Sequence, residues 1–588
     1  MLVLLSSLPP FLSSLLPLSS LHVQSHAQTP PRTDIASSSS SVANLDLSES
    51  ILIPEADAEP DTADPDTAVA SARAPVADAA SKKALRDHLR RTLSNKESHS
   101  DLTQRRPRRR STGHTLEEVS AELAEAFPPR QYFVLTDAGK PVYTSRTTER
   151  DVDGLASTIG IMQALISVFL DDGDKLRCIN AGNTRISFLI RSPLYYACVS
   201  SWGEPESVTR THLEYLHLQV LSVVSAAQLR RLFERRGNFD LRRLLNGAEV
   251  LIYSLLERLQ TDLAISTSSL HCLKLEPALR TRAANALVPS AKIKDVLYII
   301  LVAQGRVITL VRPRKHSIHP ADLHLLMNTA HSPSIVNSSA SASWLPLCLP
   351  KFDPSGFVNA YITFLQEDLK SDDASISTRE GEDATDVRSS DAEHEGAVNA
   401  GDTSTKASRK SPARPVGSGV GLICVSGNGD FESIRTWCDA VTKRLTSEGT
   451  LGAIHKAIRT QATEYSVSEL SIPGLRHFIY KSRSHVQITV PTYEDPYDDN
   501  KEQQRLMTLY QTLHDAIHAK SGQDLPLKLQ YIRTERESIM GWITQPFELY
   551  IALSPWLPKS AAVGAANAVA RWVKKEESRL FLRDAPVF

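Results

Sequence analysis

The apolar and polar positions first become periodic near Gln131, where they predict a β-hairpin followed by a helix. The segment 131–145 has an apolar run, a polar turn carrying Gly139 and Pro141, and a second apolar pair, which is the pattern of strand, turn and strand. Residues 155–170 then repeat with helical spacing and carry apolar stripes on two sides. A helix that is apolar on two sides needs two neighbours, and we expect one of them to be its own sheet. The second stripe is a candidate contact for a partner protein.

Three short strands and two helices should follow this helix. The strands are predicted at 175–180, 185–191 and 194–200, and the helices at 210–235 and 241–260. The order β-β-α-β-β-β-α-α describes an antiparallel sheet with helices packed against it. We therefore predict an α+β fold.

The same pattern recurs twice further along the chain. A second hairpin is predicted at 296–311 with a helix from Pro320, and a third at 474–490 with a helix at 501–520. The hairpins are much further apart than the roughly 20–50 residues of solenoid repeats. The sequence therefore predicts three domain-sized repeats, at 126–265, 290–470 and 471–588.

Two segments lack this periodicity and should be disordered. Residues 1–125 are rich in Ser, Ala, Pro, Asp and Arg, and residues 366–416 form a low-complexity insertion within the second repeat. Such compositions bury too little apolar surface to offset the entropy lost on ordering.

The formal net charge of -1 hides charge blocks of opposite sign. Residues 54–66 are acidic and 82–110 are basic, so near-neutrality does not exclude a local patch that binds anionic membranes. The alternative is a solvated charge run without a specific partner. The candidate membrane-binding residues are Arg105, Arg106, Arg108, Arg109 and Arg110.

The first 27 residues resemble a secretory signal, with many leucines and a cleavage-like Ser25-His26-Ala27. Against this, no Lys or Arg precedes Arg32, and prolines interrupt the apolar stretch. A disordered start without a targeting role is the other interpretation. The prolines and serines also make this stretch a poor membrane span.

Motifs that carry catalytic chemistry are missing. Gly139-Lys140 lacks the remaining glycine and hydroxyl of a phosphate loop, and the glycines at 417–421 precede a strand, whereas a dinucleotide loop follows one. There is no Cys-x-x-Cys or His-Glu-x-x-His. His514 and His518 have the i,i+4 spacing of metal ligands, but solvated or core-edge histidines are the favoured interpretation. We expect no catalytic residue, no metal and no cofactor.

Seven segments together resemble one family, the Mon subunit of the Mon–Ccz vacuolar fusion complex. They run in order from about residue 130 to the C-terminus: QYFVLTDAGKPVYTS (131–145), GIMQALISVFL (160–170), QLRRLFERRGNFDLRRLLNGAE (228–249), ADLHLLMNTA (321–330), WLPLCLPKFDPSGFVNAYITFL (344–365), GLRHFIYKSRSHVQITVP (474–491) and GWITQPFELYIALSP (541–555).

The resemblance implies three longin domains, each a five-stranded antiparallel sheet between helices. It also implies a heterodimer with a Ccz partner that acts as a guanine-nucleotide exchange factor for the late-endosomal and vacuolar Rab GTPase. Such a complex is peripheral on late endosomes, multivesicular bodies, the prevacuolar compartment and the vacuole, where it meets anionic and phosphoinositide lipid. It supports fusion of endosomes and autophagosomes with the vacuole, and so protein transport and autophagy. Exchange of this kind needs no catalytic triad, and the net charge of -1 leaves no global excess of positive charge for binding nucleic acid, so we expect none. The alternative is a longin-type trafficking adaptor without exchange activity.

By the same resemblance, the first longin domain should pair with that of the partner and form a platform for the GTPase. For the apolar helix residues, core packing against their own sheet is the alternative. Glycine inside a helix costs about 1 kcal/mol relative to alanine, so Gly160 suggests that another backbone comes close. Gly139 has a simpler explanation in a positive φ angle. The platform candidates are Gly139, Lys140, Pro141, Tyr143, Ile159, Gly160, Met162, Gln163, Ile166 and Phe169.

Overall fold

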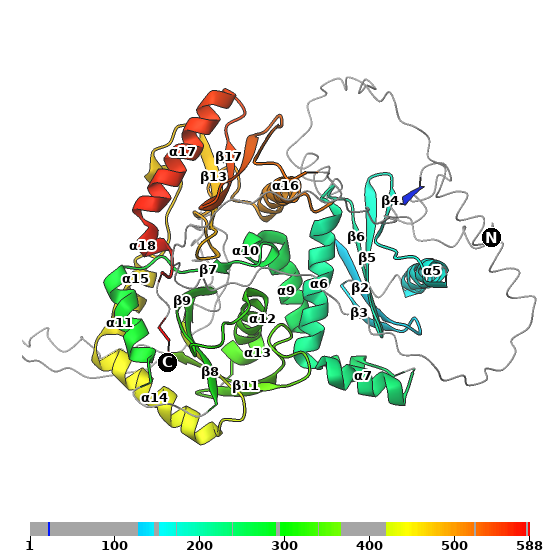
Figure 1. Ribbon diagram of the computed structural model, residues 1–588, viewed down its shortest axis with the longest axis horizontal. Coiled ribbons are helices and arrows are strands. Elements are labelled where there is room, and N and C mark those ends of the chain that lie inside the picture. The colour runs from blue at the N-terminus through cyan, green and yellow to red at the C-terminus, as the bar shows by residue number, and fades with distance from the viewer. Residues whose placement is uncertain are drawn as a thin grey trace, which may run out of the picture.

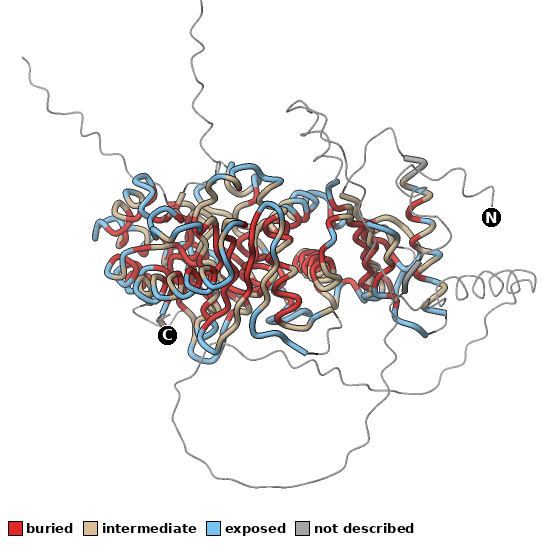
Figure 2. Tube along the Cα trace, turned by 90° about the horizontal axis from the view of Figure 1, so that it is seen from above, coloured by how far each residue is buried: buried red, intermediate tan, exposed pale blue. Residues whose placement is uncertain are grey.

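The computed structural model contains three antiparallel sheets with helices on their faces (Figure 1). Buried residues concentrate in the sheets and in the helix faces that pack against them (Figure 2). The side chains of 21–23 and 152–154 are not described. The structure describes residues 21–23, 128–145, 152–171, 173–237, 239–289, 295–338, 340–365, 419–521, 525–583 and 586–587.

The three sheets share one strand order. In each repeat the order across the sheet is third, fourth, fifth, first and second strand of that repeat, so the first hairpin strand lies between the second strand and the central fifth strand. All neighbours within these five-stranded units are antiparallel. This identical topology confirms the prediction of an α+β fold with three longin-like domains.

The first unit begins with the predicted hairpin and helix. Its sheet order is β4-β5-β6-β2-β3, and the backbone of β1 (Leu21–Val23) adds an antiparallel strand beside β4. The elements are β2 (Gln131–Thr136), β3 (Pro141–Thr144), α5 (Val152–Asp171), β4 (Cys178–Ala181), β5 (Thr184–Arg191), β6 (Leu194–Ser200), α6 (Glu206–Val223), α7 (Ala226–Arg235), α8 (Arg242–Leu245) and α9 (Glu249–Thr261).

Two of the predicted helices are each divided. The helix predicted at 210–235 ends at Val223, and the Ser225 side chain caps α7 by accepting a hydrogen bond from the Gln228 N–H at 3.3 Å. The helix predicted at 241–260 is interrupted by Gly247, whose φ is 85°. The strand predicted from residue 175 begins at Cys178.

The second unit has helices on both sheet faces. Helix α12 covers one face, while α11, α14 and α15 cover the other. Helix α11 belongs to this core, although it precedes residue 290. The elements are α11 (Pro277–Leu287), β8 (Val296–Ala303), β9 (Arg306–Val311), α12 (Pro320–Ala330), α13 (Pro333–Val336), β10 (Ser343–Leu347), β11 (Val358–Leu365), β12 (Val420–Ser426), α14 (Phe431–Ser447) and α15 (Thr450–Arg459).

The third unit has α16 on one face of its sheet and α17 on the other. The short turn η1 (Ser468–Leu470) leads into it. Its other elements are β13 (Leu475–Ser482), β14 (Gln487–Thr489), α16 (Asn500–His518), β15 (Leu529–Arg533), β16 (Ser538–Ile543), β17 (Phe547–Leu553), α17 (Lys559–Lys575) and α18 (Glu577–Leu580).

The segment between the first two units ties the sheets together. It contains α10 (Leu263–Ser266) and β7 (Leu270–His271), which runs parallel to β14 at the edge of the third sheet. The next residue, Cys272, forms a parallel bridge to Val307 in the second sheet. The end of the chain returns to the second unit, where Val587 bridges Arg312.

Several predicted features lie outside the described residues. They are the signal-like start except for the backbone of 21–23, the basic run with Arg105 to Arg110, and the acidic insertion 366–416. Within the described part of the chain, no helix has the length and apolar character needed to cross a membrane.

Candidate functional site

The first sheet has two differently covered faces. One face packs against α6 and α9, beyond which lie the second and third units (Figure 1). The other face is covered by α5, which lies on the outer side of the molecule in this view. Helix α5 is therefore one element of the first unit that is accessible to another protein.

The inner stripe of α5 forms part of the core. Ile159, Met162 and Ile166 are buried among sheet residues such as Phe133 and Phe188, and Phe169 is partly buried against the same cluster. The burial of Ile159, Met162 and Ile166 corrects the expectation that these three line a platform, because side chains enclosed by their own sheet present no surface to a partner. The core-packing alternative accounts for them.

The opposite side of α5 is exposed and lined by small residues. Ala156, Gly160, Ala164 and Ser167 are all exposed. A Cβ atom placed on Gly160 would meet no atom within 4 Å, so no described backbone of this chain explains the glycine. Surfaces of small residues allow another helix or sheet to approach closely.

The tip of the first hairpin lies against the same helix. Gly139 has a φ of 76°, and a Cβ atom there would lie 1.9 Å from Oε1 of Gln163 on α5. The Thr136 N–H donates to the Lys140 carbonyl at 2.9 Å and closes the turn. The structure thus brings Gly139, Lys140 and Gln163 together beside the exposed side of α5, and Pro141 follows at the start of β3, half-buried.

Tyr143 belongs to the other side of the sheet. Its ring packs against the core that includes α6 and α9, and it lines a cavity of about 460 Å³ with Tyr132, Trp202 and Tyr253. Burial, together with the nearby Glu249 carboxylate, raises the pKa of Tyr143 to about 12. Its hydroxyl is therefore neutral at physiological pH, and it does not share a surface with the exposed side of α5.

A buried ion pair closes one wall of that cavity. Nε of Arg130 lies 2.7 Å from Oε1 of Glu204, and both side chains are almost fully buried. The Arg130 guanidinium also lies over the Trp202 ring and donates to Oγ1 of Thr508, on α16 of the third unit, at 3.4 Å. No local spacing in the sequence signals this contact, because its members are far apart along the chain.

His514 and His518, the histidine pair of the third unit, lie close to a carboxylate that their spacing in the sequence does not indicate. His514 is buried rather than solvated, and His518 is partly exposed. Glu548 from β17 joins them to form a group in which one ligand atom of each residue lies within 4.8 Å of the others. Sequence analysis missed Glu548, because only the pairing of strand and helix brings it to the histidines.

Comparison with known families decides the identity of the chain. Models of the first, second and third longin domains of FUZ, MON1 and HPS1 match residues 130–255, 294–381 and 474–577. A Vacuolar fusion protein MON1 from Cryptococcus neoformans var. neoformans serotype D is 48% identical over 465 residues, which cover 79% of this chain and 66% of that protein. This chain belongs to the MON1 family.

Other MON1 relatives show how the match is distributed. The protein of the same name from Mycosarcoma maydis is 32% identical, covering 79% of this chain and 69% of its own length. Vacuolar fusion protein MON1 homolog A from Homo sapiens is 33% identical, and the match covers 79% of this chain and 62% of that protein. Each matched segment falls within one of the three units, although the second match ends at residue 381 and does not include β12.

Proposed function

We propose that this MON1-family chain acts in vacuolar fusion as one subunit of a heterodimeric guanine-nucleotide exchange factor. Its partner is a Ccz-type longin protein and its target is the late-endosomal and vacuolar Rab GTPase. The observation that carries the proposal is the exposed small-residue side of α5, continuous with the hairpin tip, on a sheet whose other face is buried under α6 and α9. A first longin domain with one outward helix is suited to pairing with a second longin domain.

The exchange mechanism needs binding surfaces rather than reactive side chains. A protein that binds the nucleotide-free GTPase more tightly than the loaded one lowers the affinity for nucleotide by the same factor. GDP and its magnesium ion then leave, and GTP enters because it is present in the cell. The printed name of the relatives, Vacuolar fusion protein MON1, supports the role in vacuolar fusion, and the exchange activity is our proposal for how the chain fulfils that role.

The proposed place of action is the surface of late endosomes, multivesicular bodies, the prevacuolar compartment and the vacuole. There the activated Rab would license fusion of endosomes and autophagosomes with the vacuole, and so protein transport and autophagy. We assign attachment to anionic and phosphoinositide lipid to the basic run that contains Arg105, Arg106, Arg108, Arg109 and Arg110.

Gly160→Leu tests the proposed pairing surface. A Cβ atom at this exposed position meets no atom of the described residues within 4 Å, so we expect the first unit to fold normally while a closely packed partner is pushed away. Gly564→Leu is a matched control, because Gly564 is an exposed helical glycine of α17 whose Cβ would also meet no atom within 4 Å. We expect Gly160→Leu to weaken binding of the Ccz partner at least tenfold and Gly564→Leu to leave it unchanged, measured with purified proteins by calorimetry.

If both variants bind the partner with equal affinity, α5 does not form part of the interface. A pair that forms normally but releases no nucleotide from the Rab would instead support the trafficking adaptor. The two failures are distinguishable, since one concerns the surface and the other concerns the activity.

A further inference from the structure

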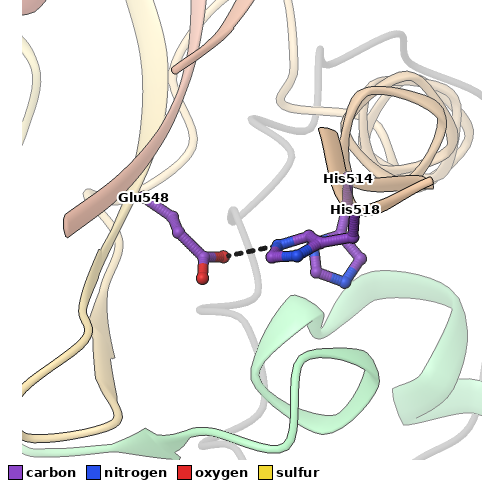
Figure 3. A group of neighbouring side chains, drawn as sticks. All are labelled: His514, His518 and Glu548. Carbon is purple, nitrogen blue, oxygen red and sulfur yellow. Dashed lines mark hydrogen bonds and ion pairs between the residues drawn. The ribbon is translucent and has the colours of Figure 1, made fainter. Parts of the chain in front are cut away.

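The side chains of His514, His518 and Glu548 form a compact group in the third unit (Figure 3). Both histidines come from α16 and the carboxylate comes from β17, and His518 reaches that carboxylate with Nε2 3.2 Å from Oε2 of Glu548. The two rings are adjacent, with centroids 4.4 Å apart. Two imidazoles and one carboxylate are ligand types that suit zinc.

Hydrogen bonds orient His514 as a ligand. The Tyr550 hydroxyl donates to Oε2 of Glu548 at 3.3 Å, so its oxygen accepts the proton of His514 Nδ1 at 2.7 Å. The lone pair of this neutral imidazole therefore lies on Nε2. Metal-bound histidines are commonly held in this way, with the second ring nitrogen donating to a fixed acceptor.

That lone pair has no hydrogen-bond partner. His514 is 8% exposed, and its Nε2 atom is buried without a donor in the structure. A buried polar atom without a partner is costly, and a nitrogen lone pair is satisfied by a hydrogen-bond donor or by a metal ion. The ligand atoms of the three residues lie within 4.8 Å of one another, so the side chains must move closer together to bind one ion at about 2.0–2.2 Å.

Basic residues around the group leave one carboxylate oxygen available. Nζ of Lys481 and Nε of Arg483 lie 3.5 Å and 3.9 Å from Oε1 of Glu548, whereas Oε2 faces His518 and Tyr550. Lys520 also lowers the pKa of His514, which burial holds well below its usual range. Lys481 and Arg483 therefore lie on the side of the carboxylate away from the histidines.

We propose that His514, His518 and Glu548 bind one Zn²⁺ ion, with water as the fourth ligand. The side chain of His518 is 26% exposed, which gives the ion and the water a route from solvent. The ion would pin the C-terminal half of α16 to β17. Because α16 also packs against α6 and α9, zinc would stiffen the junction of the third and first units.

The test measures zinc bound to the full chain, after chelation and reloading with Zn²⁺ alone. We expect one zinc per chain, visible ligand-field bands when Co²⁺ replaces it, and a rise of the melting temperature on loading. His518→Ala removes a partly exposed ligand without opening the core, and it should abolish all three signals. Tyr550→Phe removes the hydrogen bonds of the hydroxyl to His514 and to Glu548 but none of the three ligands, and it should weaken zinc binding by about 10- to 100-fold.

His477→Gln is the matched control. His477 is also buried in the third sheet, lies 3.2 Å from a tyrosine hydroxyl and has an unpartnered Nε2, but it belongs to no such three-ligand group among the described residues. This variant should retain zinc. If no zinc binds, or if His518→Ala binds zinc as well as the unmodified chain, the group is only a hydrogen-bonded ion pair and the proposal fails.

Discussion

At the scale of single residues, burial sets the chemistry of several side chains that sequence patterns treat as ordinary. Asp322 is fully buried in the first turn of α12, with Oδ1 accepting the Lys351 N–H at 3.0 Å and Oδ2 without a partner. Burial raises the pKa of Asp322 from 3.8 to about 6, although its backbone hydrogen bonds favour the ionised form. Sequence analysis predicts the helix but not the carboxylate's environment, because burial depends on the sheet beneath it.

Asp322→Asn should remove a pH dependence of stability. The folded state holds the Asp322 proton more tightly than the unfolded state, so its contribution is present below about pH 4 and is lost as the pH rises through about 6. Each pH unit across this window costs about 1.4 kcal/mol. Melting temperatures at pH 5 and pH 7.5 measure the effect, and we expect the variant to be more stable than the unmodified chain at pH 7.5 but much closer to it at pH 5. The same gap at both pH values would contradict this account.

At the scale of elements, the hairpin and its helix were predictable because their periodicity is local. The β-hairpins at the start of each repeat appear where predicted, and α5 closely matches the predicted helix 155–170. What sequence could not decide is which apolar stripe of α5 faces the sheet. Ile159, Met162 and Ile166 pack inward, whereas Ile161 and Leu165 lie half-buried on the flank. That choice depends on the position of the helix over the sheet.

The contact between hairpin tip and helix can be measured with alanine variants. Gly139→Ala adds the strain of a positive φ, about 1–2 kcal/mol, and displaces the Gln163 side chain. Gly305→Ala, at the tip of the second hairpin, carries only the strain, because its φ is 69° and its Cβ would meet no atom within 4 Å. Thermal unfolding should show a larger loss of stability for Gly139→Ala than for Gly305→Ala. Adding Gln163→Ala to Gly139→Ala should reduce the loss of stability to that of Gly305→Ala. A smaller loss for Gly139→Ala would mean that the tip does not contact α5.

At the scale of the whole molecule, hydrogen bonds between residues far apart in the sequence join the three units. The Leu270 N–H donates to Val486 at 2.9 Å in the third unit, and the Leu273 N–H donates to Val307 at 2.8 Å in the second. The side-chain amide of Gln487 donates to the carbonyl of Leu582, near the C-terminus, and accepts a hydrogen bond from the Leu582 N–H. The number of repeats follows from local patterns, whereas these ties and the Arg130–Glu204 pair depend on residues distant in sequence. Helix α11 belongs to the second unit because Leu279, Ala283 and Leu287 pack in its core.

The molecule therefore presents α5 as an outward helix on a body built from three longin domains of the MON1 family. The most direct test of the proposed function is release of fluorescent GDP from the late-endosomal Rab by this chain purified with its Ccz partner. We expect the pair to accelerate release at least tenfold over the intrinsic rate, with each subunit alone near that rate and an endocytic Rab from another compartment little affected. Release by the pair at the intrinsic rate would contradict the proposal that this chain is part of an exchange factor.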